Sequence, residues 1–259
     1  MAGRRLIIGD IHASYDKLIS VLDKASFTSD DILYSVGDIV DRGDKPVETL
    51  DFLMGLENFF PVLGNHDGWL ESYLYTGKVD SSWYMHNGGD VTVNAIRKKD
   101  RQWQLRLRSW ISKFPLIRIL DDAIIVHGGI PGEYTEKEIE NIVERGRPHP
   151  LVRNFTYDDF MDFTDDQEDE DYDYLEQFFW DRDYLYNAMY SAGVKTALLK
   201  MRRRLQPMKT DKTIWIGHTP LADCRPVINR EYHLVAIDTG SYHGKLTLVD
   251  MSSCEYWQA

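Results

Sequence analysis

The sequence predicts an α/β fold, because short apolar runs alternate along the chain with segments of helical periodicity. The apolar runs are rich in Ile, Val and Leu, and each ends at or beside a glycine, as expected for buried strands that lead into functional loops. These runs are LIIGD (6–10), ILYSVGD (32–38), FFPVLGN (59–65), AIIVHGG (123–129) and TIWIGH (213–218). Polar residues at their ends are therefore the first candidates for a functional site.

The predicted helices lie between these runs. The spacing of apolar residues indicates helices at Tyr15–Lys24, Pro46–Glu57 and Gln102–Ser112. Pro46 suits the first turn of its helix, where a backbone N–H is not needed. A further helix is predicted to begin near Val194 and to end in the three arginines 202–204, whose charges would complement the helix dipole. We expect the helices to pack on the faces of the sheet.

Length and charge narrow the class of protein. A chain of 259 residues is long enough for one large core, so we expect a single domain over residues 1–259. Forty-two acidic against thirty basic residues give a net charge of -12, which disfavours nucleic acid or an anionic membrane as a partner. The segment Asp158–Glu176 holds eleven carboxylates and no Lys or Arg, and we expect it to form a loop or cap within an insertion at about 145–190.

The cysteines and the first residues of the chain indicate the cellular compartment in which the protein is expected. Cys224 and Cys254 are the only cysteines, lie far apart and form no CxxC pair, so neither a disulfide framework nor a thiolate zinc site is expected. Any metal has to be held by His, Asp and Asn. The opening residues MAGRRLIIGD offer only three apolar residues after the arginines, too few for a secretory signal, and no later run approaches membrane-spanning length. We therefore expect a cytoplasmic protein.

Three short motifs follow the first three apolar runs in order: GDIH (9–12), GDIVDRG (37–43) and GNHD (64–67). Each motif stands at the end of an apolar strand, which is the context that makes it more than a string match. Oxygen and imidazole ligands without a thiolate suit Mn²⁺, Fe or Zn²⁺. An Asp-x-His pair at a strand end, such as Asp10 and His12, can send both side chains toward one ion.

Two divalent ions are the predicted cofactors. Two ions about 3.5 to 4 Å apart clamp a phosphoryl group and lower the pKa of a water held between them. Asp38 is the expected bridging ligand, because it is central in the order of the motifs. The expected ligands of the first ion are Asp10 and His12, and those of the second are Asn65, His127 and His218. Such a cluster of buried carboxylates requires cations, since like charges at close range resist joint ionisation.

Three further residues suit phosphate chemistry. The planar guanidinium of Arg42 can bind a phosphate through two parallel hydrogen bonds, which a lysine cannot do. His66 follows an expected metal ligand but is better suited to act as an acid. With a carboxylate partner, for which Asp41 is the candidate, it would donate a proton to the oxygen of the leaving group. The motifs together predict hydrolysis of a phosphate ester.

These motifs, with HGG (127–129) and GHTP (217–220), resemble the PPP-type phosphoprotein phosphatases of the calcineurin-like metallophosphoesterase superfamily, from Gly9 to about Gly240. The resemblance implies a four-layer sandwich of two mixed β-sheets flanked by helices, formed by one catalytic domain. It implies two metal ions, Mn²⁺ first with Fe or Zn²⁺ as alternatives, and direct attack by metal-bound water without a covalent phosphoenzyme. It also suggests Arg182, in the triplet WDR (180–182), as a second phosphate-binding arginine.

The sequence departs from the eukaryotic pattern of this family. Ala13 replaces the glycine that usually follows the GDxH histidine, at a conformational cost. GNHD stands where the eukaryotic phosphatases have GNHE, and the run IDTG occupies 237–240. Both features resemble the bacterial and phage branch of the family and the symmetrical diadenosine tetraphosphatases.

The leading interpretation of the sequence is a phosphoprotein phosphatase for phosphoserine and phosphothreonine, extending to phosphotyrosine. The alternative substrate is diadenosine tetraphosphate, whose charges and adenines require extra cations and aromatic surfaces. The cations would come from Arg145, Arg147, Arg153 and the cluster 202–204, whereas the acidic segment Asp158–Glu176 would repel a polyanion. A non-catalytic scaffold is disfavoured, because every expected ligand is present. The expected partner is a phosphorylated protein or a small phosphoester, and the oligomeric state stays open.

Overall fold

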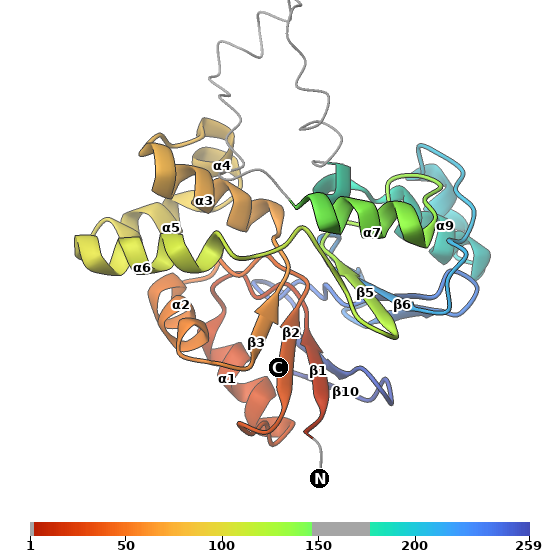
Figure 1. Cartoon of the computed structure of the whole chain (residues 1–259), viewed down its shortest axis with the longest axis horizontal. Helices are drawn as coiled ribbons and strands as arrows, with labels where there is room; N and C mark the ends of the chain where they lie inside the picture. The colour runs from red at the N-terminus through yellow and green to blue at the C-terminus, as the bar shows by residue number, and fades with distance from the viewer. Residues whose placement is uncertain (1–2, 147–176) are drawn as a thin grey trace, which may run out of the picture.

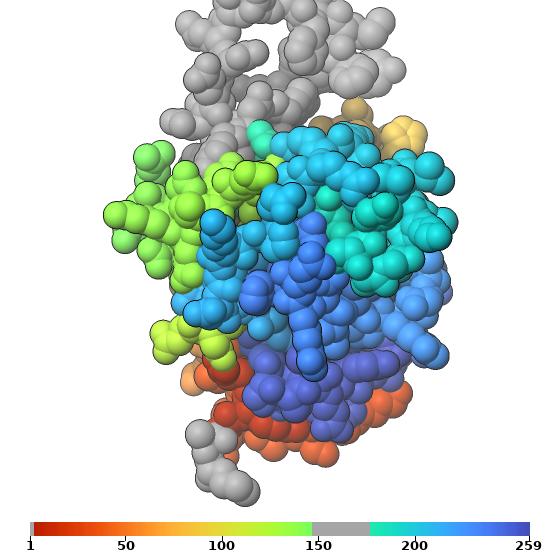
Figure 2. All heavy atoms as spheres, turned by 90° about the vertical axis from the view of Figure 1, so that its right-hand side faces the viewer, coloured from red at the N-terminus to blue at the C-terminus, as the bar shows by residue number. Residues whose placement is uncertain are grey.

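Two five-stranded sheets form the centre of the protein in the computed structural model, which describes residues 3–146 and 177–259. The first sheet has the order β10 (Tyr256–Gln258), β9 (Thr247–Asp250), β1 (Arg5–Ile8), β2 (Ile32–Ser35), β3 (Phe59–Pro61). The second has the order β4 (Ile117–Ile119), β5 (Ala123–Val126), β6 (Thr213–Ile216), β8 (Leu234–Ala236), β7 (Val227–Asn229). The first sheet joins both ends of the chain, and Figure 2 shows the red N-terminal residues against the dark blue C-terminal ones.

Helices cover the outer faces of the two sheets. They are α1 (Tyr15–Lys24), α2 (Pro46–Met54), α3 (Asn65–Thr76), α4 (Ser81–His86), α5 (Gly89–Ile96), α6 (Arg101–Ile111), α7 (Glu136–Arg145), α9 (Asp183–Ser191) and the 3₁₀ turn η2 (Lys195–Leu199). Helix α1 contacts β9 and β10 of the first sheet, whereas α7 and α9 contact β4, β7 and β8 of the second. Figure 1 shows the two groups of helices on opposite sides of the molecule.

Both sheets are mixed. In the first, β1 pairs in parallel with β2 and β2 with β3, whereas β9 runs antiparallel to β1. In the second, β5, β6 and β8 are parallel, with β4 and β7 as antiparallel edges. Carboxyl ends of parallel strands meet at one edge of a sheet, so the residues that follow β1, β2, β5 and β6 are brought to shared edges.

The alternation of side chains along each strand explains the four layers. Ile7 of β1 belongs to a cluster with Trp215 of β6 and Val235 of β8, which fills the space between the two sheets. Its neighbour Leu6 points to the opposite face and packs in the larger cluster with Leu18 and the other apolar residues of α1. Each sheet therefore has one face against the other sheet and one face against helices. The predicted four-layer sandwich of two mixed sheets is confirmed.

Local sequence explains where the predicted helices begin and end. Helix α1 has the predicted bounds. Helix α2 begins at Pro46 as predicted but stops at Met54, where the weak helix former Gly55 follows. Helix α6 begins at Arg101, one residue before the predicted start, since the carboxylate of Asp100 caps it by accepting a hydrogen bond from the N–H of Trp103.

Two expectations about secondary structure need correction. The helix predicted to begin near Val194 is only the 3₁₀ turn η2, which ends at Leu199, so the arginines 202–204 are not at the end of an α-helix. The five predicted strands are present, but β4, β7, β8, β9 and β10 were not predicted. These five strands have three or four residues each, like the predicted ones, but none is followed within three residues by the glycine that marked the others.

The single domain over 1–259 stays a prediction. The acidic segment Asp158–Glu176, and most of the expected insertion at about 145–190, lie outside the described residues. Among the helices within 3–146 and 177–259, none is long and apolar enough to cross a membrane.

The start of β1 is anchored to the loop before β2 by an ion pair. Arg4 Nη2 lies 2.8 Å from Asp31 Oδ2, and the same carboxylate accepts hydrogen bonds from the backbone N–H groups of Arg4 and Thr28. The hydrogen bond from Arg4 lowers the pKa of Asp31 to about 2. The carboxylate of Asp31 therefore binds a proton more weakly in the folded protein than in the unfolded chain.

We expect Asp31→Asn to lower the free energy of unfolding near neutral pH and to have a smaller effect in acid. In the folded protein this carboxylate stays charged down to about pH 2, whereas in the unfolded chain it becomes protonated at about pH 4. The stabilisation is therefore present above the unfolded pKa and is lost as the pH falls toward the folded one. Urea unfolding of both proteins at about pH 6 and about pH 3 measures the difference. A difference that is the same at both pH values would contradict this account.

Candidate active site

The first sheet supplies four of the predicted site residues from the ends of its parallel strands. Asp10 and His12 follow β1, Asp38 follows β2, and Asn65 is the first residue of α3 after β3. All four side chains are buried. The strand-end pattern seen in the sequence therefore does bring these residues to one edge of the sheet.

The second sheet supplies His127 after β5 and His218 after β6. His127 Nδ1 donates a hydrogen bond of 2.7 Å to the carbonyl of Val36, in the first sheet's β2 loop, and its own carbonyl accepts one from the N–H of Gly217. The hydrogen bond from Nδ1 fixes the imidazole ring of His127 so that its Nε2 faces the residues from the first sheet. The site therefore lies where the edges of the two sheets meet.

The loops that hold the site have an unusual backbone. Five site residues have a positive φ, namely His12 (45°), Asp38 (52°), Asp41 (73°), Arg42 (67°) and His218 (65°). Side chains other than glycine rarely adopt this conformation, and such residues cluster at functional sites. Ala13 also has a positive φ of 51°, the conformation that the glycine usual at this position adopts at lower cost.

Two glycines let the loops approach one another. A β-carbon at Gly64 would collide with the carboxylate and backbone N–H of Asp38, and one at Gly217 would collide with the carboxylate of Asp10. Larger residues at these positions would push the ligand groups apart. The glycine in GNHD and the one in GHTP are thus needed by close packing around the two aspartates.

The carboxylate of Asp38 lies at the centre of the site. Its Oδ2 is 3.3 Å from His127 Nε2, 3.8 Å from His12 Nε2 and 3.9 Å from His66 Nε2. Two groups of side chains have the spacing of metal ligands, one formed by His12, Asp38 and His66, the other by Asp38, His127 and His218. Asp38 is common to both groups, which is the geometry that a bridging ligand needs.

Asn65 and Asp10 complete the surroundings of these groups. Asn65 Oδ1 lies 2.9 Å from His127 Nε2 and 3.0 Å from His218 Nδ1, so three predicted ligands of one ion converge. The carboxylate of Asp10 accepts a hydrogen bond from the N–H of His218. Carboxylate, amide and imidazole groups suit the divalent ions that the sequence predicts. The first group contains His66 in place of the expected Asp10, and the assignment of each ligand stays a prediction.

Buried carboxylates give the site a strong demand for positive charge. Burial and the nearby Asp238 raise the pKa of Asp10 well above its ordinary value. Burial and repulsion by Asp38 raise the pKa of Asp67 to about 7 and that of Asp238 to about 6. Groups that resist ionisation in this way become anionic readily only beside cations. The donor set therefore fits divalent metal ions.

Asp38 and His127 form a buried charge pair in the site. Burial opposes the charged form of Asp38, yet attraction by His127 and His66 holds its pKa well below the ordinary value. Burial likewise opposes the charged form of His127, but the attraction of Asp38 raises its pKa to about 10. An imidazole has to give up this proton before it can bind a metal ion, so a divalent cation would take over the role of that proton beside Asp38.

Two buried aspartates were not assigned a role from the sequence. Asp67 accepts hydrogen bonds from the backbone N–H groups of Asp38, Ile39 and Gly64, and so ties the second and third motif loops together. It is the last residue of GNHD, so the motif itself contained the signal. Asp238 follows β8 and is 2% exposed. Its position after an apolar run is the same pattern that identified Asp10.

The structure places His66 and Asp41 in direct contact. His66 Nδ1 lies 2.6 Å from Asp41 Oδ2, and both residues are buried. The carboxylate of Asp41 also accepts hydrogen bonds from the hydroxyl of Thr92 and from the indole N–H of Trp83. Three donors thus fix this carboxylate, which in turn orients the His66 ring. Neither Thr92 nor Trp83 was expected from the sequence.

Arg42 lies on the open side of this pair. Its Nη1 is 3.1 Å from His12 Nε2 and its Nη2 is 3.1 Å from His66 Nε2, while the guanidinium lies 4.9 Å from the centre of the Tyr242 ring. The residue is half-buried, in contrast to the metal-ligand candidates. Its charge is therefore available at the surface of the buried cluster, where a phosphate would enter.

Arg182 lies at the rim of the site. It is exposed and precedes α9, and its neighbour Trp180 packs its ring 5.3 Å from the ring of His218. Burial, together with the charges of His127 and Arg182, lowers the pKa of His218. The structure therefore brings Arg182 to the second sheet's side of the site, with Arg42 on the first sheet's side.

This fold and donor set define the class of metal-dependent phosphoester hydrolases. The sequence profile of the calcineurin-like phosphoesterases matches residues 3–235, and the chain belongs to that family. The expected membership of the superfamily is therefore confirmed, and a family of phosphoesterases agrees with the expected hydrolysis of phosphate esters. Membership of the PPP-type branch stays a prediction.

Two curated relatives with sequence similarity share one name. The chain is 32% identical over 169 residues to the symmetrical bis(5'-nucleosyl)-tetraphosphatase of Vibrio parahaemolyticus, covering 62% of this chain and 59% of the relative. It is 36% identical over 135 residues to the protein of the same name from Coxiella burnetii, covering 51% and 44%. The matched part thus spans between two fifths and three fifths of these relatives.

Solved structures with the same fold carry different names. A protein provisionally assigned as a diadenosine tetraphosphatase matches with a TM-score of 0.60 and 18% identity, over 100% of this chain and 94% of that one. A cold-active protein tyrosine phosphatase matches with a TM-score of 0.59 and 18% identity, over 100% and 79%. At this identity the likeness concerns the fold alone, and it does not decide between the two substrates.

We expect Thr92→Val to lower the kcat of phosphoester hydrolysis by about tenfold with little change in KM, because it removes one of the donors that hold Asp41. Thr92→Ser keeps the hydroxyl and should restore kcat. Thr49→Val is a matched control, since it removes a buried hydroxyl in α2 that donates to the carbonyl of Lys45, the residue before the helix. Wild-type kcat in Thr92→Val would contradict the positioning role.

Proposed function

We propose that this phosphoesterase hydrolyses dinucleoside polyphosphates such as diadenosine tetraphosphate. The observation that supports the proposal is the shared name of the relatives from Vibrio and Coxiella. From the sequence alone, this substrate was the alternative and a phosphoprotein was the leading interpretation. Phosphoprotein hydrolysis stays a prediction, and the same experiments test it. The proposal keeps the expected cytoplasmic location and the expected absence of nucleic-acid and membrane partners.

In this proposal the buried cluster holds two divalent ions, with Mn²⁺ expected first and Fe or Zn²⁺ as alternatives. When bound, such ions neutralise the phosphoryl oxygens and lower the pKa of the attacking water. Asp38 would bind both ions. The first ion would also be bound by Asp10 and His12, and the second by Asn65, His127 and His218. The convergence of Asn65 Oδ1 on His127 Nε2 and His218 Nδ1 supports the second set.

The bond that breaks joins the bridging oxygen to the phosphorus attacked by water. In symmetrical cleavage of a tetraphosphate, each product is a nucleoside diphosphate, and the departing bridging oxygen needs a proton. His66 is placed to supply it from Nε2, because Asp41 holds Nδ1; Nε2 takes up that proton once Arg42, which donates to it in this structure, has turned its guanidinium to the phosphate. Asp41 therefore acts through His66 by fixing the orientation of its ring.

The two arginines would bind the phosphate from opposite sides. Arg42 donates toward His12 and His66 and can redirect its guanidinium to phosphate oxygens that enter between them. Arg182 is exposed beside Trp180 on the second sheet's side. One cation at the metal cluster and one at the rim suit a substrate with more than one charged phosphate.

We expect the protein supplied with Mn²⁺ to hydrolyse diadenosine tetraphosphate with a kcat/KM at least about tenfold above that for a phosphoserine or phosphotyrosine peptide. Ratios on one preparation report differences in transition-state binding between substrates. Nucleoside diphosphate should be the only nucleotide product. A larger kcat/KM for either phosphopeptide would instead support the phosphoprotein phosphatase interpretation and contradict our proposal.

We expect His66→Asn to lower kcat by about a hundredfold or more, with the larger loss for substrates whose leaving group is more basic. Phenyl phosphate should therefore lose more activity than para-nitrophenyl phosphate. His233→Asn is the control, because His233 lies in the turn between β7 and β8 at a positive φ that asparagine tolerates. Equal losses for the two esters would show that His66 does not protonate the leaving group.

A further inference from the structure

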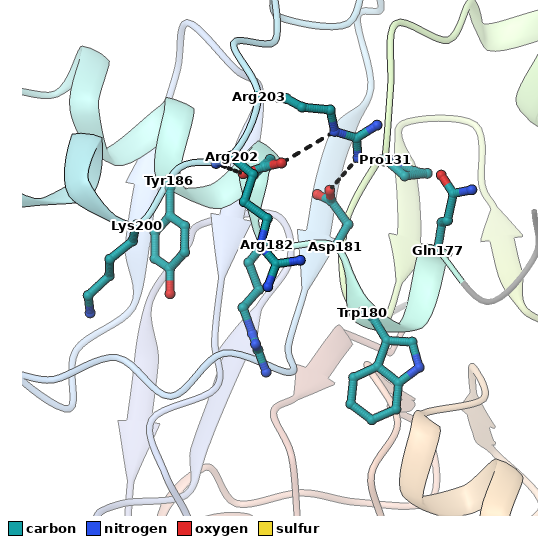
Figure 3. Close-up of a pocket in the computed structure, with 10 residues that line it drawn as sticks. Pro131, Gln177, Trp180, Asp181, Arg182, Tyr186, Lys200, Arg202 and Arg203 are labelled. Atoms are coloured by element: carbon teal, nitrogen blue, oxygen red, sulfur yellow. Dashed lines mark hydrogen bonds and ion pairs between the residues drawn. The ribbon is translucent and has the colours of Figure 1, made fainter. Parts of the chain in front are cut away.

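A pocket of about 780 Å³ lies beside the candidate active site, and the mechanism above does not use most of it. Its walls include the aromatic residues Trp180 and Tyr186 and the cations Arg182, Lys200, Arg202 and Arg203 (Figure 3). The volume is within the range of small-molecule binding sites. The pocket therefore has room for a group larger than the phosphate that reacts.

The pocket is more positive than the protein around it. Its two carboxylates are both paired with Arg203, that of Asp181 at 3.6 Å (Figure 3) and that of Asp183 at 3.4 Å. Asp183 also accepts a hydrogen bond from the backbone N–H of Arg202. Within the part of the chain that the structure describes, the side chains of Lys200 and Arg202 form no ion pair. A surplus of cations in a chain of net charge -12 indicates a binding site for an anion.

Aromatic side chains connect this pocket to the active site. Trp69 packs against both His66 and Trp180, with ring centres 5.1 Å and 5.6 Å apart, and Trp180 packs against His218. Trp180 is nevertheless 41% exposed, so part of its ring can contact a ligand. One end of the pocket is thus formed by the residue that touches a predicted metal ligand.

We propose that this pocket binds the half of a dinucleoside polyphosphate that lies away from the attacked phosphorus. The inference rests on the proposed function. With one phosphate at the buried cluster, the remaining phosphates and nucleoside can extend past Arg182 into the pocket that it lines, where Lys200 and Arg202 offer cations. A planar base can stack on the exposed part of Trp180 or on Tyr186, since aromatic faces accept any base.

The same pocket explains why a small monoester would gain little from these residues. A monoester fills only the position between the buried cluster and Arg42, because it has no second phosphate to reach Lys200. The cations of the pocket therefore act on the affinity for long substrates and leave the chemistry at His66 unchanged. This difference between substrates is the property that an experiment can measure.

The test compares the double variant Lys200→Gln/Arg202→Gln with the control Lys98→Gln/Arg101→Gln. The control removes the same charges from exposed residues, Lys98 in the turn between α5 and α6 and Arg101 at the start of α6, on the other side of the molecule from α9 (Figure 1). With diadenosine tetraphosphate, we expect the pocket variant to lose at least about tenfold in kcat/KM, mostly through KM. With para-nitrophenyl phosphate, both variants should match the wild type. A parallel loss on both substrates, or no loss on either, would overturn the assignment.

Inhibition separates this inference from the proposed function. Wild-type protein that cleaves the monoester but not diadenosine tetraphosphate would contradict the proposed function alone. The pocket is then tested with ATP and with inorganic phosphate as inhibitors of monoester hydrolysis. We expect the inhibition constant of ATP to rise about tenfold in the pocket variant and that of inorganic phosphate to stay constant. An unchanged inhibition constant for ATP would exclude the pocket as a nucleotide site.

Discussion

The buried carboxylate of Asp38 is the group on which the rest of the site depends. Its Oδ1 accepts a hydrogen bond from the N–H of His66, and its Oδ2 lies 3.3 Å from His127. Its own backbone N–H donates to Asp67. Asp38, in the loop after β2, thus connects the third motif loop to the second sheet. A charge this deeply buried is tolerated because the opposite charges around it are as fixed as the carboxylate itself.

The fold supplies that fixation through packing between the sheets. The apolar cluster of Ile7, Trp215 and Val235 holds the two sheets face to face, so the ends of β2 and β5 meet at a constant distance. The hydrogen bond from His127 to Val36 then sets the orientation of the imidazole. Positive φ angles at His12 and Asp38 are imposed at the same edge. The packed core therefore balances the backbone strain that the site requires.

The sequence predicted those features that depend on local pattern. A strand followed by Gly-Asp identified Asp10 and Asp38, because the pattern and the position in the sheet have the same cause. Thr92 and Trp83 could not be found in this way, since they contact Asp41 across 51 and 42 residues of sequence and have no motif. The contact of His66 with the first ligand group is likewise set by tertiary packing. Short edge strands such as β4 were missed because Arg118 interrupts a three-residue run.

Charge composition and local charge arrangement lead to opposite expectations about the substrate. A net charge of -12 and the acidic segment Asp158–Glu176 disfavour a polyanion at long range. That repulsion is screened over about one Debye length, ~8 Å at physiological salt, whereas contacts at hydrogen-bond distance are not. Lys200 and Arg202 line the pocket beside the active site, where the carboxylates of Asp181 and Asp183 are already paired with Arg203. Selection of the substrate is therefore expected to follow the few cations that touch it and not the average charge of the protein.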